Sequence, residues 1–547
     1  MKFPCVIILP MKLHPKAVRI LLALISVLYF AAACLPNSVG SENFAMVNMF
    51  EPDELANYYV IERMTSPKPN LQVFLQYFVT YDYYHYGLPF FGLSALVAYP
   101  LRWTGQFGNL PLLMLVERQF ISVLPTLIAL LLLVYMQDQF RTYRSVLLYL
   151  LLLLVPAVLK NSLWWHPDGL VLLFAVLALF FLWKDERTYG KFYRWAAVMA
   201  GVLTATKLIG VYFFISIIPL LILSVREGKL TSKAAFHKWL AFAGITAGAF
   251  VLANPFVFSP PALVKYLYTI YNQLTVVSKG YGVVYASGLA AALPEMHTYF
   301  GSALFLLTAL GTSIWAILKG KDKHLALVIL CWFVPLTLTV VVGAHFKFQY
   351  WLPAALPLIS NLVLLFPEPG ERLKPLPQQL LRDVLAILII MQLGFFLQQD
   401  MAMFQAQAIR AEHDERLSFF EETQAVLQPL AGQKLKVYYD YRLYVPTDMP
   451  NWQIETSFDL LSYAYIQEHN FDVLLLLQQR IWDYTNPEAV GIDPEAFALS
   501  QRFYRDADAG EIEGYDLVYR TPLALVFVKE SLCAAYFPAP ACHFQYP

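Results

Sequence analysis

Three carboxylates lie within four positions near the start of the chain, in the segment Phe50-Glu51-Pro52-Asp53-Glu54. An ionised carboxylate can take the proton of a reacting hydroxyl group, which is general-base chemistry. The segment follows an apolar run long enough to cross a bilayer. We therefore predict Asp53 and Glu54 as catalytic residues, with Asp53 as the base and Glu54 as its helper.

The same residues also have a purely structural interpretation. Pro52 at the first position of a helix, with Asp53 and Glu54 in the first turn, would complement the helix dipole. That interpretation leaves the aromatic Phe50 and the junction with the apolar run unexplained. We favour chemistry at this segment for that reason.

The elements that position these residues belong to a membrane protein. Of the 547 residues, 58% are hydrophobic and only 14% are charged, with a mean hydropathy of +0.52. Soluble domains are about 45–50% apolar. Basic and acidic residues balance at 39 each, so the composition gives no argument for nucleic-acid binding.

Eleven apolar runs are candidates for membrane spans, because about 20 apolar residues cross the hydrocarbon core. They cover residues 17–35, 118–136, 145–159, 169–183, 195–206, 208–224, 239–253, 300–318, 325–342, 351–366 and 384–397. A further run, 86–101, is short and contains Gly87 and Pro89 near its start. We predict that it does not span, and that the membrane domain is all-α, with about eleven transmembrane helices and additional interfacial helices.

Charge determines the predicted topology. With a cytoplasmic N-terminus and a non-spanning run at 86–101, every short basic loop falls on the cytoplasmic side, as the positive-inside rule expects. These loops cover residues 141–144, 184–194, 226–238, 319–323 and 372–382. Residues 1–397 then form the membrane domain, 37–117 a long external loop, and 398–547 an external C-terminal domain.

The C-terminal domain is predicted to be small and α/β. Residues 435–439 and 471–477 have strand patterns, 458–468 have helical spacing, and 517–519 with 523–528 flank a Thr521-Pro522 turn like a hairpin. Cys533 and Cys542 share this domain, where an oxidising compartment could join them. Two free thiols are the alternative.

Two features concern location. The basic start and the following apolar run could be a cleaved signal, but ten more runs follow, so we expect an uncleaved first span. The sequence contains no Asn-x-Ser/Thr sequon and no lysine-rich retention tail. These absences favour a bacterial inner membrane over the endoplasmic reticulum.

With this topology, ionisable residues gather on the external face, where such groups near a membrane are costly and usually functional. Besides Asp53 and Glu54, the predicted substrate-binding residues are Lys207, His345, Lys347, His85, His166 and Asp168. The set suits transfer of a sugar from a lipid phosphate to an acceptor hydroxyl. Asp53 would take the hydroxyl proton, while Lys207, His345 and Lys347 would hold the departing phosphate.

Several segments carry a resemblance to a known family. They are Phe50-Glu51-Pro52-Asp53-Glu54, Tyr84-His85-Tyr86-Gly87-Leu88-Pro89, His166-Pro167-Asp168, Thr206-Lys207-Leu208-Ile209-Gly210 and Lys347-Phe348-Gln349-Tyr350-Trp351-Leu352-Pro353. In order and sidedness they resemble the GT-C class of polytopic glycosyltransferases, closest to the branch with protein O-mannosyltransferases and the lipid A aminoarabinose transferase. The resemblance covers most of residues 1–400.

This resemblance implies an inverting transferase that uses a polyprenyl-phosphate sugar, with Asp53 as the base and a glycan, lipid or protein as acceptor. Two departures from the family pattern stand out. Lys347 or Gln349 occupies a place where arginine is common, and neither residue offers arginine's bidentate fork. His85-Tyr86-Gly87-Leu88-Pro89 replaces a Glu-Lys-Pro or Pro-Pro segment, which is compatible with another sugar or another donor lipid.

Several of these residues have structural alternatives. His166-Pro167-Asp168 could simply begin a helix, and Lys207 could be a snorkelling lysine. His345 and Lys347 could be ordinary interfacial residues. The carboxylate and histidine mixture could also hold a divalent metal, but no pair sits at ligand spacing within one element, so no metal is assigned.

Two other function classes compete. A transporter or lipid-linked sugar flippase would also place ionisable residues at membrane depth. The one-sided clustering and the lack of detectable inverted repeats in the sequence argue against it. In the third class, a scaffold, the polar loop residues would be incidental.

Overall fold

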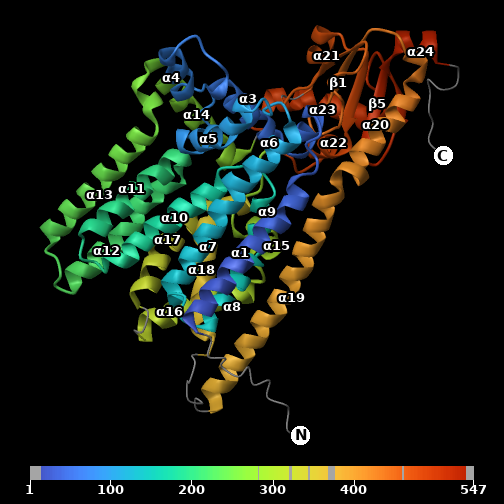
Figure 1. Cartoon of the computed structure of the whole chain (residues 1–547). Helices are drawn as coiled ribbons and strands as arrows, with labels where there is room; N and C mark the ends of the chain where they lie inside the picture. Colours follow the sequence, from blue (N-terminus) through green and yellow to red (C-terminus); the bar gives the residue numbers. More distant parts are fainter. Residues whose placement is uncertain are drawn as a thin grey trace, which may run out of the picture.

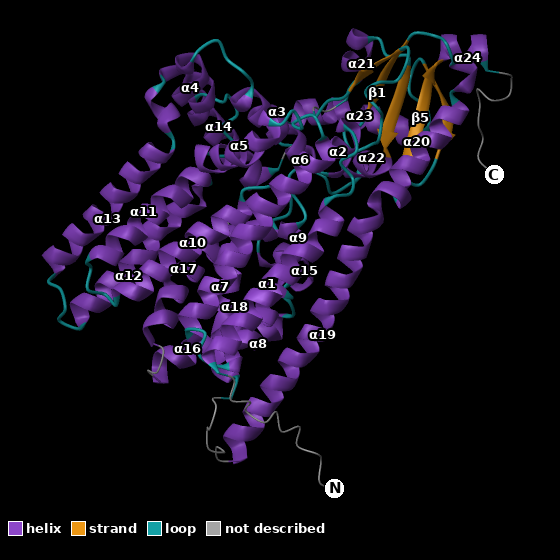
Figure 2. Ribbon diagram, in the orientation of Figure 1, coloured by secondary structure: helices purple, strands orange, loops and turns teal. Residues whose placement is uncertain are grey.

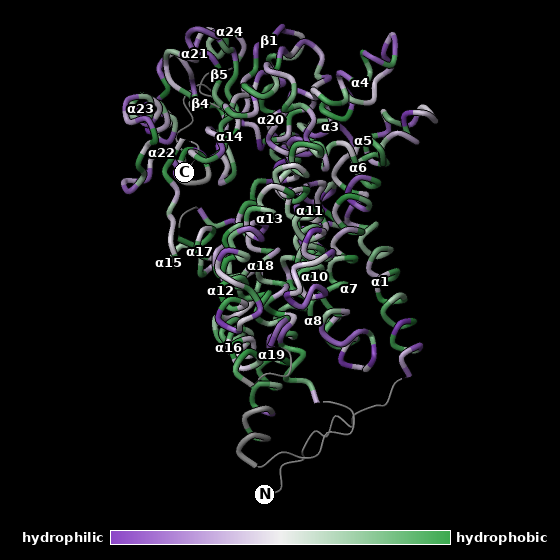
Figure 3. Tube along the Cα trace, turned by 90° about the vertical axis from the view of Figure 1, so that its left-hand side faces the viewer, coloured by the Kyte–Doolittle hydropathy of each residue, from purple (hydrophilic) through white to green (hydrophobic). Residues whose placement is uncertain are grey.

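The computed structural model describes residues 14–280, 282–319, 323–342, 345–367, 376–458 and 461–537. It shows a bundle of long helices with a small mixed sheet at one end (Figure 1). Among the described residues, the strands lie in that end domain (Figure 2). Hydrophobic residues line much of the length of the bundle helices, and hydrophilic stretches occur in the connecting loops (Figure 3).

Seven helical segments among the described residues are long and apolar enough to cross a membrane. They are α1 (Pro15–Asn37), α6 with η1 and α7 (Leu110–Asp138), η2 with α12 (Leu208–Arg226), α13 (Ser232–Ala253), α17 (Lys323–Val342), α18 with η4 (Phe348–Leu365), and the segment Asp383–Val426 that includes most of α19. Two bent pairs raise the number to nine if each is one span. They are α8 (Tyr143–Leu153) with α9 (Pro156–Ser162), bent by 65°, and α15 (Leu289–Phe300) with α16 (Ala303–Lys319), bent by 84°.

The all-α membrane domain is thus confirmed, while the count of eleven spans stays a prediction. The two predicted spans that are not among these nine candidates correspond to α10 (Asp168–Asp185) and α11 (Lys191–Thr206). The first carries charges at both ends, and the second has only 16 residues. Both pack inside the bundle, α10 against α7 and α11 against α13.

The segment between α1 and α7, which covers the predicted external loop 37–117, contains short helices. They are α2 (Phe44–Phe50), α3 (Pro52–Thr65), α4 (Leu71–Val79), α5 (Leu88–Trp103) and α6 (Leu110–Glu117). In Figure 1, α3, α4 and α5 gather with α14 (Pro260–Lys279) at the end of the bundle that carries the sheet. Helix α5 corresponds to the apolar run 86–101, which we predicted from the sequence not to span the membrane.

The C-terminal domain follows α19 (Leu376–His413) and α20 (Glu415–Val426). Residue 398, the expected start of this domain, lies within α19, which continues to His413. The five-stranded sheet has the order β2-β1-β3-β5-β4. Its strands are β1 (Leu435–Tyr439), β2 (Trp452–Glu455), β3 (Val473–Leu477), β4 (Tyr515–Arg520) and β5 (Ala524–Lys529).

Strands β2, β1 and β3 are parallel, and β5 runs antiparallel to both β3 and β4. The register pairs Val437 with Val473 and Leu475 with Val526. Alternate side chains on these strands pack into two apolar clusters, one on each face. Helices α21 (Tyr463–His469), α22 (Gln478–Thr485), α23 (Pro494–Ala509) and α24 (Glu530–Tyr536) complete the domain.

The predicted strands at 435–439 and 471–477 and the hairpin around Thr521-Pro522 are confirmed. The helical spacing at 458–468 corresponds to α21, although residues 459 and 460 lie outside the described part. Cys533 is disulfide-bonded. Its expected partner Cys542 lies outside the described residues.

Candidate functional site

A chain of polar contacts joins residues from three distant segments. Lys207 directly follows α11, and Asp168 is the first residue of α10. The Nζ atom of Lys207 lies 2.7 Å from Oδ1 of Asp168. The other oxygen of Asp168 contacts Nδ1 of His166. The Nε2 atom of His166 lies 3.9 Å from Oδ2 of Asp53, in the first turn of α3. The structure thus brings four of the predicted site residues together.

Two aromatic side chains fix the ring of His166. Trp164 stacks on it with ring centroids 4.0 Å apart, and the Tyr86 hydroxyl lies 2.6 Å from Nε2. Because the Asp168 carboxylate can only accept, Nδ1 is assigned as the protonated nitrogen and Nε2 accepts from Tyr86. The His166 side chain is only 3% exposed, so its orientation is set by these contacts.

The carboxylates of this site differ in exposure. The Asp53 side chain is 51% exposed, whereas the Asp168 side chain is 1% exposed. A base that takes a proton from a substrate must be reachable by it. Asp53 meets that condition, and Asp168 is enclosed between His166 and Lys207.

Glu54 points the other way and is fully buried. Its two oxygens accept from Arg118 Nε at 2.8 Å and Nη2 at 2.5 Å, and one also accepts from the Trp165 backbone N–H at 2.6 Å. Asn57, one turn later on α3, donates to the Trp165 carbonyl at 3.1 Å. Together Glu54 and Asn57 attach α3 to the loop that carries His166. Glu54 has no exposed oxygen with which to meet a substrate.

A second lysine approaches the first. Lys347 precedes α18, and both it and Lys207 lie over the ring of Tyr350, at 6.0 and 4.4 Å from its centroid. Burial lowers the pKa of Lys347, the charge of Lys207 lowers it further, and Asp53 and Asp168 oppose that shift. Two cations held this close favour an anion between them.

Glycine is required at position 87 to bring Tyr86 to this site. A Cβ atom there would overlap the carbonyl oxygen of Ala205 near the end of α11, and the Gly87 N–H donates to the Thr206 carbonyl at 3.2 Å. Asn254, after α13, donates to the Ala205 carbonyl at 3.1 Å. The turn that carries Tyr86 is thereby fixed against the segment that carries Lys207.

The two remaining predicted residues have other contacts. The Nδ1 atom of His85 lies 2.8 Å from the Gln273 amide on α14, and burial lowers the pKa of His85. The ring of His345 packs on Tyr285 at 4.6 Å, and its Nδ1 lies 3.3 Å from the Ala286 carbonyl. The contacts described for His345 are therefore with the segment after α14 and not with Asp168 or Lys207.

No metal site is assigned. Within the described ranges, no group of three or more histidine, cysteine or acidic side chains is arranged to hold a metal ion. The contacts given above instead join His166 and Asp168 to neighbouring side chains.

Sequence reasoning missed some residues of the site. Tyr86 and Tyr350 lie in segments that carry the family resemblance, but nothing in their spacing indicates a contact with His166 or the lysines. Arg410 and Arg416, which lie over the Phe50 ring at 4.5 and 5.0 Å, come from the other end of the chain. Only folding reveals these long-range partners.

No protein-family model matches the sequence, and no curated protein matches it. Solved structures do match. The crystal structure of ArnT from Cupriavidus metallidurans bound to undecaprenyl phosphate is 12% identical, with a TM-score of 0.50, covering 96% of this chain and 99% of that one. The Archaeoglobus fulgidus oligosaccharyltransferase tethered with an acceptor peptide containing the NVT sequon is also 12% identical, with a TM-score of 0.52, covering 94% of this chain and 74% of that one.

The chain has the GT-C fold. ArnT and the oligosaccharyltransferase are both GT-C glycosyltransferases, and the match extends over most of this chain. The resemblance read from the sequence motifs is confirmed at the level of the fold. At 12% identity the likeness concerns the arrangement of the elements, and the chemistry has to be argued from the site.

Proposed function

We propose that this protein is an integral-membrane glycosyltransferase that moves a sugar from a polyprenyl-phosphate donor to an acceptor hydroxyl. One observation carries the proposal. An exposed carboxylate, Asp53, lies beside His166; the buried His166–Asp168 pair contacts Lys207, and Lys207 and Lys347 both lie over the ring of Tyr350. The fold supports it, because ArnT, with the same fold, was crystallised with undecaprenyl phosphate.

The reaction proposed for this site is an inverting displacement. The acceptor oxygen attacks the anomeric carbon while Asp53 takes the hydroxyl proton. The bond between that carbon and the phosphate oxygen breaks on the opposite face of the sugar. The electron pair leaves with the phosphate, and the products are the glycosylated acceptor and the polyprenyl phosphate.

Lys207 and Lys347 hold the departing phosphate in this scheme. Their mutual repulsion contributes to the lowered pKa of Lys347. A phosphate between them would relieve this repulsion, and its growing negative charge during bond cleavage would strengthen both contacts. Both ammonium groups lie near the ring of Tyr350, which contributes to their placement beside each other.

His166 and Asp168 act as positioning residues between the base and the lysines. Asp168 orients Lys207 through the 2.7 Å contact, and His166 fixes Asp168 from the other side. Glu54 supports this arrangement indirectly, through Arg118 and the Trp165 backbone. We accordingly assign Glu54 to the support of α3 rather than to chemistry.

We further propose a bacterial inner membrane as the location, with the N-terminus cytoplasmic and this site and the sheet domain on the periplasmic face. The partners are then the lipid-linked sugar in the bilayer and an acceptor glycan, lipid or protein. The sheet domain contacts α2, which leads into α3 and Asp53, since Asn48 of α2 donates to the Tyr441 carbonyl at 3.1 Å. An acceptor would approach where these two parts meet.

The test is mass analysis of lipid-linked sugars and envelope glycans in a strain that lacks the gene. A transferase leaves a polyprenyl-phosphate sugar unused and one glycan without its added residue. The wild-type gene and a Glu62→Gln variant, changed on the same helix, should restore the glycan, whereas Asp53→Asn should not. Unchanged glycans in the deletion strain, or full restoration by Asp53→Asn, would contradict the proposal.

A further inference from the structure

A polar cavity lies at the other end of the bundle from Asp53. Its volume is about 630 Å³, and its walls include the end of α7, the residues after α10 and the start of α17. Helix α10 connects the two regions, because it begins at Asp168 and ends at Asp185, next to Glu186 in the cavity wall. At 1.5 Å per residue, α10 places them about 25 Å apart.

Basic side chains dominate this cavity. Its charged or titratable lining residues are Arg141, Arg144, Arg187, Lys229, Lys323 and His324 against Asp138 and Glu186. Glu227, beside the cavity, is shared between two of the cations, at 3.0 Å from Arg187 and 3.7 Å from Lys229. The cavity therefore has an excess of positive charge, which attracts anions.

The Asp138 carboxylate is engaged with the backbone and hydroxyl groups of its own loop. Its Oδ2 accepts from the Thr142 N–H at 3.0 Å, the Thr142 hydroxyl at 2.7 Å and the Ser145 hydroxyl at 2.8 Å. These bonds hold the loop between α7 and α8, which carries Arg141. Asp138 thus shapes the cavity wall, and the five arginine and lysine side chains of the lining still outnumber its two carboxylates.

Asp185 fixes another part of the wall, the loop after α10, in the same way. It is buried and accepts from the backbone N–H groups of Tyr189 at 2.6 Å, Gly190 at 3.0 Å and Tyr193 at 3.1 Å. These bonds fix the loop after α10, which carries Arg187. Two carboxylates therefore preorganise the two arginine-bearing loops before any ligand arrives.

Both loops also hold a backbone conformation that non-glycine residues avoid. Gln139 and Phe140 have φ values of 50° and 57°, and Glu186 and Arg187 have 50° and 62°. Such left-handed residues persist where surrounding contacts enforce them, and they concentrate at functional sites. Here the bonds to Asp138 and Asp185 supply that enforcement.

The remaining lining residues place the cavity at the edge of the membrane. Trp183, Leu325 and Leu364 give it an apolar side, and α7 and α17 are among the membrane-spanning candidates. Tryptophan is enriched at the level of lipid headgroups. Arginine forks match the geometry of phosphate oxygens. We propose that this cavity binds a phosphate group, carried either by a membrane lipid or by a soluble phosphoester.

Binding to the purified full-length protein tests this inference. The probes are phosphatidic acid, phosphatidylcholine as the lipid whose phosphate is masked by a cationic group, and inorganic phosphate. We expect Arg141→Gln combined with Lys323→Gln to weaken phosphatidic acid binding by roughly tenfold or more, because charged hydrogen bonds are lost. If inorganic phosphate competes with phosphatidic acid, the phosphate group is carried by a soluble ligand. If phosphatidic acid binds and inorganic phosphate does not compete, it is carried by a lipid.

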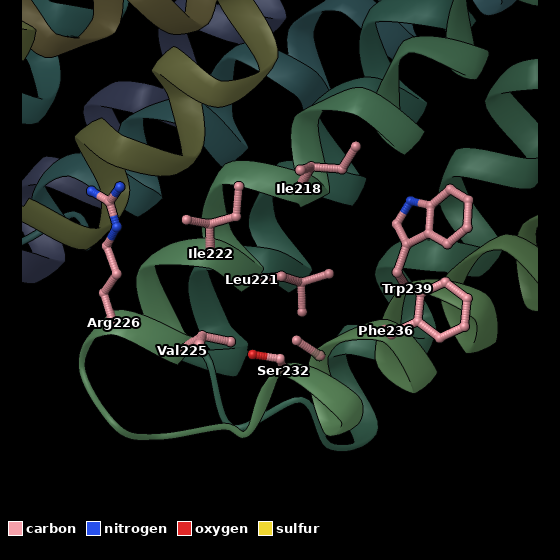
Figure 4. Close-up of a pocket in the computed structure, with 9 residues that line it drawn as sticks. Ile218, Leu221, Ile222, Val225, Arg226, Ser232, Phe236 and Trp239 are labelled. Atoms are coloured by element: carbon pink, nitrogen blue, oxygen red, sulfur yellow. The ribbon is translucent and has the colours of Figure 1, made fainter.

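The matched control removes two charges from the same end of the bundle without touching the cavity. Lys191 begins α11, and Arg226 lines a separate, largely apolar groove between α12 and α13 (Figure 4). Arg226→Gln with Lys191→Gln should keep wild-type affinity. Equal loss in both double variants, or no loss in either, would overturn the proposal.

The proposed donor site also takes a phosphate, so the titration is repeated on a Lys347→Gln background. Binding to the cavity should persist there with its full dependence on Arg141 and Lys323. Loss of all phosphatidic acid binding in Lys347→Gln would overturn the cavity proposal while leaving the proposed function intact. Thermal unfolding without ligand checks that each variant is folded.

Discussion

At the scale of single residues, the adjacent carboxylates Asp53 and Glu54 have different surroundings. Asp53 is half exposed and faces His166, whereas Glu54 is fully buried against Arg118. The sequence points to the acidic cluster as a candidate site but does not distinguish the surroundings of Asp53 from those of Glu54. The difference comes from Arg118, the partner of Glu54, which lies 64 positions further along the chain. The sequence proposed Lys207 and Lys347 as substrate-binding residues, but it did not indicate that both lie over the ring of Tyr350.

The lowered pKa of Lys347 predicts a pH dependence. As pH rises, Lys347 loses its proton at a lower pH than an ordinary lysine, because burial and Lys207 disfavour its charge. Under the proposed function, KM for the donor should then rise on the alkaline side. Lys347→Arg keeps its charge, so the same rise should occur at a higher pH. Identical alkaline limits in the two proteins would argue against a phosphate contact.

The burial of Glu54 predicts an effect on stability. Glu54→Gln leaves the Arg118 guanidinium buried without its counter-charge, and breaking a buried pair costs about 3–5 kcal/mol. The variant should unfold at a lower temperature than the wild type, measured in the same detergent. Glu62→Gln on the same helix is the control and should be close to neutral. Wild-type stability in Glu54→Gln would refute the structural role.

At the scale of elements, local sequence patterns predict individual helices and strands, but they do not predict which strands pair. An alternating pattern predicted β1, a continuous apolar run predicted β3, and the Thr521-Pro522 turn predicted the β4–β5 hairpin, while longer apolar runs predicted the long helices. The parallel pairing of β1 with β2 and β3 was not foreseen, because strand order depends on contacts far apart in the chain. The same limit explains why the Tyr86 turn was not placed against the end of α11.

That turn makes Gly87 a test of the site's assembly. Gly87→Ala introduces a Cβ atom that overlaps the Ala205 carbonyl, so the turn has to move away from α11. Transfer should fall by roughly tenfold or more, since small displacements of positioned groups are costly for catalysis, while circular dichroism keeps its helical signal. Gly244→Ala, which meets nothing within 4 Å on α13, should leave transfer unchanged. Equal activity of the two variants would contradict the assigned packing.

At the scale of the whole molecule, the sheet domain and the membrane domain meet beside the acidic segment. Phe50 lies against Arg410, near the end of α19, and Arg416, at the start of α20. Arg416 also donates to the Met49 carbonyl at 3.0 Å. The C-terminal helices therefore fix the segment that leads into α3 and Asp53. Composition and charge predicted a membrane domain and a C-terminal domain, but they did not predict the contact between the two.

The role of Asp53 is tested most directly by separating donor binding from turnover in the purified Asp53→Asn protein. The asparagine keeps the shape of the side chain but cannot take a proton. Donor affinity should stay within about twofold of the wild type, while single-turnover transfer should fall by about a hundredfold or more. Transfer at the wild-type rate in Asp53→Asn would contradict Asp53 as the base.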